Sequence, residues 1–433
     1  MTVAAMAAGP GWWRLAAYGL LGLPLAMAAL PVYVHVAAYY SAVRGVGLVE
    51  LGWVLFSARL LDTVQDPVLG HLIDRLRGGI ARWLALGALV LALAFAGLWL
   101  PPAGGVPAAL WLGCMLLLAY SAHSMLNIAY LAWGAGLGGG VRASAPLLSA
   151  SAWREGAGVA GMVIASVIPA TVMSGEAARV PARMGAYSLA FAALLLIALL
   201  ALLRAAPPWS APAGSGSGDD WRAALRRVAG NDAFRRLLAP YFLNACSVSL
   251  PATLALFFIN DQLRAAPLAG AFLGSYFLAA ACGLPLWTAL ARRIGVLRCW
   301  RLGMGLAIAS FAGAGLLGPG DTLPYFAVCI AAGAALGADL AMPPVLLASM
   351  IGAGEATGAY YGVLTLLGKL ALALSGLALP LLAMLGYRPG MAEGVALPLV
   401  YAGLPCLLKL LAMAALWRGP PSIAPIPPYR SSP

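Results

Sequence analysis

Charged residues are scarce in this sequence. Only 9% of the 433 residues are Asp, Glu, Lys or Arg, whereas 63% are hydrophobic. A water-soluble protein of this length needs a polar and charged surface, so the composition excludes a soluble globular fold. The one long polar stretch, residues 204–236, is too short for a separate catalytic domain. The sequence therefore predicts a protein that is solvated by lipid.

Catalytic signatures are missing as well. The sequence has no Gly-x-x-x-x-Gly-Lys-Ser/Thr phosphate loop, no Ser–His–Asp order of a hydrolase and no cluster of metal ligands. The six cysteines are scattered in or beside apolar segments, where we expect small buried side chains rather than disulfides. We therefore expect neither an enzyme nor an ATP-driven pump, and no cofactor. Outside transport, the alternative is an integral-membrane enzyme acting on a lipid-linked substrate.

Apolar segments recur along the whole chain. Each has roughly 20 residues, which is enough for a helix to cross a hydrocarbon core of about 30 Å. They predict an all-α polytopic membrane protein with about twelve transmembrane helices. The predicted spans are residues 15–40, 46–73, 83–100, 108–134, 147–173, 185–203, 237–258, 269–290, 300–317, 323–347, 359–385 and 397–416.

The basic residues predict the orientation. Lys and Arg in short loops are retained on the cytoplasmic side of a membrane. With both termini inside the cell, the even-numbered connections and the tails carry most of the basic residues. The opposite side carries only Arg44, Arg179, Arg183, Arg264 and Arg388. Topology thus accounts for the net charge of +12 without a nucleic-acid partner, and we expect a multi-pass protein of the inner membrane.

The polar stretch 204–236 divides the chain into halves, and we place it on the cytoplasmic side. We predict an N-terminal six-helix bundle at 1–204, a linker at 205–234, a C-terminal six-helix bundle at 235–417 and a tail at 418–433. After the second span, Gly70, Asp74 and Arg75 form the pattern Gly-x-x-x-Asp-Arg. At the same place in the second half, a span ends in the basic turn of residues 285–295, which is a weak internal repeat. In this loop motif the sequence resembles the major facilitator superfamily.

The strongest group of charged residues lies in the second span. Arg59, Asp62 and Asp66 have i, i+3, i+7 spacing and therefore share one face of a helix. Two carboxylates one turn apart could bind Na⁺, or could share a proton. The alternative is a buried Arg–Asp network that only fixes helix packing. Pro67 and Gly70 could bend the helix here and expose carbonyl oxygens.

Other ionisable residues lie inside spans, where a charge is costly and hence a functional candidate. Asp339 precedes Pro343-Pro344, which should break the helix. We weigh two roles for Asp339 evenly: a second proton or cation site, or a helix-packing residue. Glu155 is expected to be the charge partner of Arg154. Lys409 lies near the cytoplasmic end of its span, so we expect its ammonium to extend to the membrane surface.

The second-span motif, with Lys369 in YGVLTLLGK, resembles the glycoside–pentoside–hexuronide:cation symporter family. The similarity also includes Tyr18-Gly19 in the first span, Leu385–Tyr387, and Arg154 with Gly161 in the fifth. The resemblance implies that Asp62 and Asp66 bind the coupling cation. It further implies that Lys369 is the positive neighbour that relieves their charge when the site is empty.

The resemblance also implies a substrate site. The family's sugar-binding acids correspond here to Asn127 and to Leu25 or Pro24. Asn127 can still hydrogen-bond hydroxyl groups, and Ser124, Tyr130 and Arg154 are expected to join it. We therefore predict a Na⁺- or H⁺-coupled symporter of a sugar or related small polar solute, acting as a monomer. A lysophospholipid-like or other amphiphilic substrate is the alternative.

Overall fold

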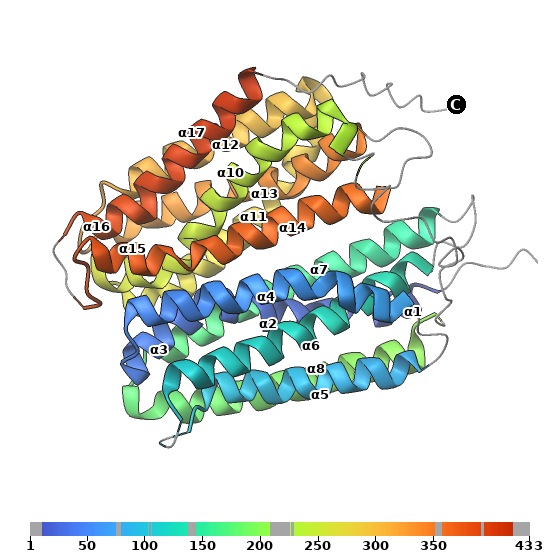
Figure 1. Ribbon diagram of the computed structural model, residues 1–433, viewed down its shortest axis with the longest axis horizontal. Helices are drawn as coiled ribbons and strands as arrows, with labels where there is room; N and C mark the ends of the chain where they lie inside the picture. Colours follow the sequence, from blue (N-terminus) through green and yellow to red (C-terminus); the bar gives the residue numbers. More distant parts are fainter. Residues whose placement is uncertain are drawn as a thin grey trace, which may run out of the picture. The chain divides into compact units, whose positions relative to one another are not determined.

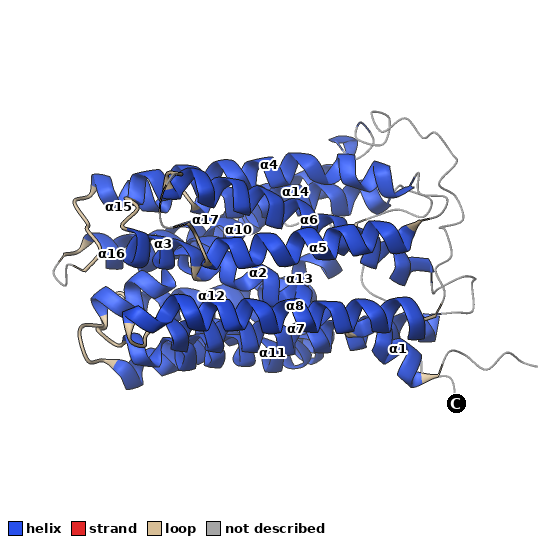
Figure 2. Ribbon diagram, turned by 90° about the horizontal axis from the view of Figure 1, so that it is seen from below, coloured by secondary structure: helices blue, strands red, loops and turns tan. Residues whose placement is uncertain are grey.

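The computed structural model describes residues 11–74, 79–102, 104, 106–136, 144–207, 226, 229–350, 357–390 and 394–418. All regular secondary structure within these residues is helical, as Figure 2 shows. The chain divides into two compact units. The first comprises Met1–Ser217 and Pro267–Gly274, and the second comprises Gly218–Ala266 and Ser275–Pro433.

The first unit contains eight α-helices and one 3₁₀ turn among its described residues outside Pro267–Gly274. Helices α4 and α6 lie side by side in it, as do α5 and α8 (Figure 1). The elements are α1 (Trp12–Gly19), α2 (Gly22–Val34), α3 (Val36–Arg44), α4 (Leu48–Asp74), α5 (Ile80–Trp99), α6 (Ala108–Gly136), α7 (Ser144–Met173), η1 (Ala177–Arg179) and α8 (Val180–Ala205).

The second unit follows the same design of long helices joined by short connections. Helix α10 packs against α14 and α17, and α12 packs against α13 and α17. The elements are α10 (Asp232–Phe257), η2 (Phe258–Gln262), η3 (Ala266–Leu268), α11 (Ala269–Ile294), α12 (Val296–Ala314), α13 (Thr322–Ala348), α14 (Thr357–Ser375), α15 (Ala378–Met384), α16 (Ala396–Pro398), η4 (Leu399–Gly403) and α17 (Leu404–Arg418). The start of α11, up to Gly274, groups with the first unit.

Ten spans among the described residues are long and apolar enough to cross a membrane. Two further helices match predicted spans but are not among these ten: α4 with 27 residues and α12 with 19. Helix α4 holds Arg59, Asp62 and Asp66, and α12 begins with Arg298 and Arg301 close together. The polytopic helical fold is confirmed. The count of twelve transmembrane helices stays a prediction; it would be reached if α4 and α12 also cross the membrane.

Proline does not interrupt the helices as expected. Helix α13 runs from Thr322 to Ala348 with Pro343 and Pro344 inside it, so the predicted break is wrong. Helix α4 likewise continues through Pro67 to Asp74. Proline removes one hydrogen bond and crowds one carbonyl, but packing against neighbouring helices can hold a membrane helix together across it. In α13 that packing comes mainly from α12.

Close helix contacts in the first unit depend on small residues. A Cβ atom at Gly22 of α2 would lie 2.7 Å from the carbonyl oxygen of Arg154 on α7, closer than side chains tolerate. Small residues at such crossings let membrane helices approach each other closely. Glycine at this position therefore fixes where Arg154 sits relative to α2.

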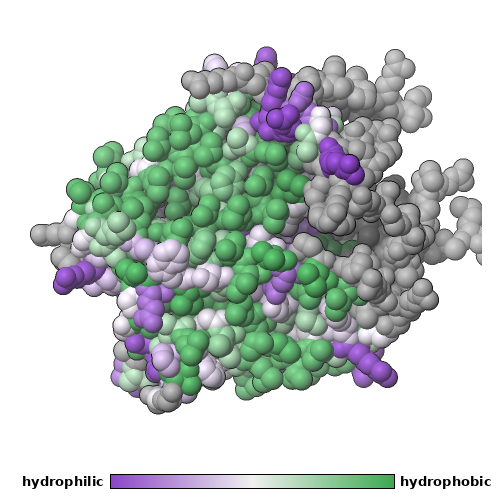
Figure 3. Space-filling model, in the orientation of Figure 1, coloured by the Kyte–Doolittle hydropathy of each residue, from purple (hydrophilic) through white to green (hydrophobic). Residues whose placement is uncertain are grey.

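Hydrophobic side chains fill both units and cover much of their outer faces. In the second unit, Phe234, Trp300, Met342 and Leu416 belong to one buried cluster contributed by α10, α12, α13 and α17. In Figure 3, hydrophobic side chains dominate the visible surface over the helices of each unit. Large exposed apolar residues such as Leu316 support burial in lipid.

Of the predicted linker 205–234, the structure describes residues 205–207, 226 and 229–234, and of the tail only residue 418. The predicted domain bounds and the cytoplasmic position of the linker remain predictions.

Candidate functional site

Asp62 lies at the centre of a polar group inside the first unit. Its side chain is buried, and its Oδ1 atom accepts hydrogen bonds from Gln65 Nε2 at 2.9 Å and from Ser124 Oγ at 3.2 Å. Ser121 Oγ donates to Gln65 Oε1 at 2.6 Å. Helices α4 and α6 supply all four residues, because they pack side by side. We call this group, Asp62, Gln65, Ser121 and Ser124, the Asp62 centre.

Arg59 lies one turn before Asp62 and is only 2% exposed. Its Nε donates to Tyr120 OH at 3.4 Å, and one terminal nitrogen donates to the Tyr33 carbonyl at the same distance. The guanidinium also lies 5.7 Å from the centre of the Tyr33 ring. A fixed positive charge and two tyrosines from α2 and α6 thus adjoin the Asp62 centre, and the aromatic face adds cation–π attraction.

Asp66 follows one turn after Asp62 and is half-buried. Both carboxylates act electrostatically on the buried Tyr33. On the other side of α4, Leu61, Val64 and Val68 are exposed. The helix therefore has its charged residues on the face that packs into the unit. This is the arrangement that the spacing predicted, and binding of a cation there remains a prediction.

The predicted substrate residues fall into different surroundings. Arg154 pairs with Glu155 at 2.6 Å, which confirms Glu155 as its charge partner, and Arg154 stays partly exposed. Tyr130 is buried, and its hydroxyl donates to the carbonyls of Tyr18 and Gly19. A solute would have to compete with these bonds. Asn127 is half-buried on α6.

Ser124 belongs to the Asp62 centre, so the structure places it with the predicted cation ligands rather than with Tyr130 and Arg154. Lys369 is half-buried in the middle of α14, in the second unit. Its pairing with Asp62 and Asp66 stays a prediction. In the loop motif, Gly70 and Asp74 are part of α4, while the Asp74 side chain and all of Arg75 lie outside the described residues.

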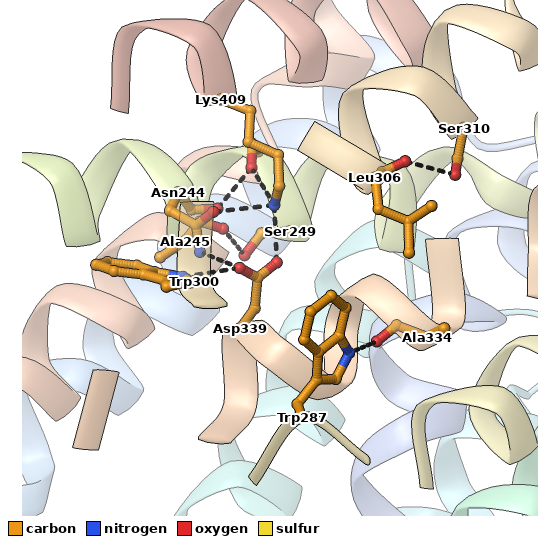
Figure 4. Close-up of polar contacts among 11 residues, drawn as sticks. Asn244, Ala245, Ser249, Trp287, Trp300, Leu306, Ser310, Ala334, Asp339 and Lys409 are labelled. Carbon is orange, nitrogen blue, oxygen red and sulfur yellow. Dashed lines mark hydrogen bonds and ion pairs between the residues drawn. The ribbon is translucent and has the colours of Figure 1, made fainter. Parts of the chain in front are cut away.

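A second polar group surrounds Asp339 in the second unit (Figure 4). Its Oδ2 accepts a hydrogen bond from Lys409 Nζ at 2.7 Å. Its Oδ1 accepts from Trp300 Nε1 at 3.0 Å and from Asn244 Nδ2 at 3.1 Å. Lys409 Nζ also donates to Asn244 Oδ1 at 2.9 Å and reaches Ser247 Oγ at 3.4 Å. We call these five residues the Asp339 centre.

The expectation for Lys409 is wrong. Instead of extending to the membrane surface, its side chain is 4% exposed and forms an ion pair with Asp339, itself 5% exposed. The position of Lys409 near a span end favoured snorkelling, but a buried carboxylate within reach offers the ammonium a far better partner than the interface. The sequence does not reveal that the Lys409 ammonium lies close to Asp339, because this distance depends on how α13 and α17 pack.

Several residues in or beside the two centres were not predicted: Tyr33, Gln65, Tyr120, Ser121, Asn244, Ser247 and Trp300. Gln65 and Asn244 carried a usable signal, since an amide inside an apolar span needs hydrogen-bond partners just as a charge does. The hydroxyl and indole residues carried none, because such side chains are common in membrane helices for packing and for anchoring at the interface.

Comparison with known proteins settles the family. A family model described as MFS/sugar transport protein matches residues 15–421, nearly the whole chain. The chain belongs to this family. It is therefore a transporter of the major facilitator superfamily rather than an enzyme. The narrower resemblance to the glycoside–pentoside–hexuronide symporters stays a prediction, and no curated protein matches the chain significantly.

Solved structures of this superfamily share the fold. A mutant of the nucleoside transporter NupG has a TM-score of 0.73 at 14% identity, covering 93% of this chain and 99% of that one. A bacterial homologue of the human lysosomal transporter Spinster has 0.68 at 14% identity, covering 94% of each chain. The E. coli fucose:proton symporter FucP has 0.56 at 14% identity, covering 94% and 98%. At such identities these structures support the fold alone.

Proposed function

We propose that this transporter is a symporter that couples Na⁺ or H⁺ to the uptake of a sugar or related small polar solute, with the cation at Asp62 and Asp66. The observation that carries the proposal is the Asp62 centre, a buried carboxylate whose partners Gln65 and Ser124 each carry an oxygen. Fucose and nucleoside carriers with the same fold make a polar solute the natural first choice.

The chemistry of these partners suits reversible cation binding. Amide and hydroxyl groups both donate and accept, so rotation of Gln65 or Ser124 would turn an oxygen toward a bound Na⁺ without moving a helix. Hard cations favour several such oxygens alongside carboxylates. A proton would instead occupy one carboxylate of the Asp62–Asp66 pair, where two like charges one turn apart disfavour full ionisation.

Coupling follows from the cost of charge inside the membrane. An empty carboxylate pair is costly to carry through the conformational change, whereas a bound cation, or an ion pair to Lys369, makes that change permitted. The cation and the solute then move together because only the loaded forms interconvert readily.

Two measurements on the full-length protein test this proposal. The first is thermal stability in NaCl against choline chloride at equal ionic strength, and across pH, because a cation that binds the folded state raises its melting temperature. The second is uptake into proteoliposomes of radiolabelled hexoses, pentoses, glycosides, nucleosides and a lysophospholipid, with and without a Na⁺ or proton gradient.

We expect Asp66→Asn to remove both the cation-dependent stabilisation and gradient-driven accumulation, while solute exchange without a gradient persists. Combining Asp66→Asn with Lys369→Ala should be milder than the sum of the single changes if these groups are partners. Glu176→Gln, an exposed acid paired with Arg179 in the same unit, is the matched charge control. Full gradient-driven accumulation by Asp66→Asn would contradict a cation site at Asp62 and Asp66. Gradient-driven uptake of the lysophospholipid alone would contradict a sugar or small polar solute as substrate.

A further inference from the structure

Four helices of the second unit meet at the Asp339 centre. Asn244 and Ser247 come from α10, Trp300 from α12, Asp339 from α13 and Lys409 from α17. These contacts lie next to the buried apolar cluster that contains Trp300 and Met342. An ion pair in such surroundings is costly to desolvate, and only complete hydrogen bonding offsets that cost.

Each proton of the Lys409 ammonium has an acceptor, and both oxygens of the Asp339 carboxylate accept hydrogen bonds. An ammonium has three protons to donate, and Lys409 faces three acceptors, in Asp339, Asn244 and Ser247. The carboxylate of Asp339 receives three donors, from Lys409, Asn244 and Trp300. Asn244 serves both partners at once, with its amide nitrogen toward the carboxylate and its oxygen toward the ammonium.

Two of the three groups that donate to Asp339 cannot reverse their roles. Lys409 and the Trp300 indole are donors only, and neither can turn an oxygen toward an added cation. The ammonium at 2.7 Å already occupies the position on Oδ2 that such a cation would take. A monovalent cation therefore sits in this centre already, tethered to the chain.

We propose that the Asp339 centre is a monovalent-cation site permanently occupied by the protein's own Lys409 ammonium. It holds α10, α12, α13 and α17 together and exchanges no ion during transport. This assigns Asp339 a role independent of the cation proposed at Asp62 and Asp66, and it leaves the second unit without a coupling ion at this centre.

Chemical replacement of the tethered cation tests the assignment. Lys409→Ala removes the side chain beyond Cβ, and n-propylammonium replaces the missing atoms from Cγ to Nζ. Melting temperatures of the full-length protein in detergent would be compared in n-propylammonium chloride, NaCl and choline chloride at equal ionic strength. The control is Asp339→Leu with Lys409→Ala, which removes the carboxylate that would hold the amine.

We expect Lys409→Ala to melt at least about 5 °C below the wild type, because it leaves a buried charge without its partner. n-Propylammonium should restore much of this loss in Lys409→Ala and should have no such effect on the wild type or on the control. Equal stabilisation of the control by the amine, or a Lys409→Ala protein as stable as the wild type, would overturn the proposal.

A second variant covers the case in which Lys409→Ala does not fold. Asp339→Leu with Lys409→Met replaces the pair by apolar side chains of similar size, a change that buried ion pairs often tolerate. We expect this protein to fold and to melt closer to the wild type than Asp339→Leu alone. A double variant no more stable than Asp339→Leu alone would show that the two groups do not act as a pair. None of these stability measurements depends on whether Asp62 and Asp66 bind a cation.

Discussion

The two polar centres solve the same problem in different ways. Each buries one carboxylate inside a helical unit and surrounds it with hydrogen-bond donors. At Asp62 the partners include an amide and a hydroxyl, which can reverse their roles. At Asp339 they include an ammonium and an indole, which cannot. A carboxylate among reversible partners can gain and release a cation, whereas one among fixed donors is suited to hold a structure.

The two centres also differ in the contacts that their neighbouring basic side chain makes. A basic residue lies at each centre: Arg59 beside the Asp62 centre donates to Tyr120 and to the Tyr33 carbonyl, among other contacts. Lys409 directs its contacts to the acid and to the two residues beside it. A basic side chain committed to one acid removes that acid from ion exchange. Under the two proposals, Asp62 and Asp66 exchange a cation, whereas Asp339 and Lys409 hold the helices of the second unit together.

The largest expected effect is the difference in unfolding free energy between the variants Asp339→Asn and Asp62→Asn. Asp339→Asn leaves the Lys409 ammonium buried without a countercharge, which should cost about 3–5 kcal/mol of unfolding free energy. Asp62→Asn should cost clearly less, because the amide keeps an oxygen for Gln65 and Ser124, and Asp66 remains to balance Arg59. Thermal unfolding of both proteins in the same detergent measures the difference.

Asp62→Asn carries a second expected result, the loss of cation-dependent stabilisation, while Asp339→Asn should keep that response if it folds. The comparison between the centres breaks down if both variants lose the same stability, or if only Asp339→Asn loses the response to cations.

A smaller effect is expected at the amide of each centre. Asn244→Leu removes a residue that hydrogen-bonds both members of the ion pair, so we expect a loss of about 2–3 kcal/mol. Gln65→Leu removes one amide donor to the Asp62 carboxylate and should cost about 1.5 kcal/mol, yet weaken the response to Na⁺ or pH more than Asn244→Leu does. Equal stability losses, with no effect of Gln65→Leu on cation response, would contradict the proposed division of roles.

Much of this architecture could be predicted from the sequence. Apolar runs fixed the helical membrane class, because length and composition are local properties. The face shared by Arg59, Asp62 and Asp66 followed from helical periodicity alone. The loop pattern at Gly70 and Asp74 pointed to the superfamily that the family match confirms.

What could not be predicted depends on which helices touch. Lys409 and Asp339 are 70 residues apart, and only the packing of α17 and α13 brings them together. Local backbone preferences predict a helix break at Pro343 and Pro344, but tertiary packing keeps α13 continuous. Ser124 was placed with the substrate residues through a resemblance, whereas its hydroxyl contacts Asp62.

Removal of a single donor should have a modest effect. Trp300→Phe keeps an aromatic ring in the apolar cluster but removes one of three donors to Asp339, for an expected loss of about 1.5–3 kcal/mol typical of a bond to a charged group. Ser124→Ala in the Asp62 centre removes the corresponding hydroxyl donor. We expect it to lose less stability, because its bond to Asp62 is longer, 3.2 Å against 3.0 Å. A larger loss of stability in Ser124→Ala than in Trp300→Phe would contradict the proposed difference between the two centres.

The smallest expected effect on stability comes from Ser121→Ala, and this variant tests most specifically whether the Gln65 amide can turn its oxygen toward a cation. Ser121 Oγ donates to Gln65 Oε1 and thereby keeps the amide nitrogen directed at Asp62. Ser121→Ala removes that restraint at a cost of about 0.5–1.5 kcal/mol. The Gln65 oxygen is then free to turn toward a cation, so the half-maximal Na⁺ concentration for stabilisation should fall, or the pH response should change if the ion is a proton. Ser166→Ala is the matched control, since Ser166 is a buried serine of the same unit whose hydroxyl donates to the Val163 carbonyl of its own helix. If both serine variants shift the cation response alike, Gln65 is not the switchable ligand, and the Asp62 centre is as fixed as the Asp339 centre.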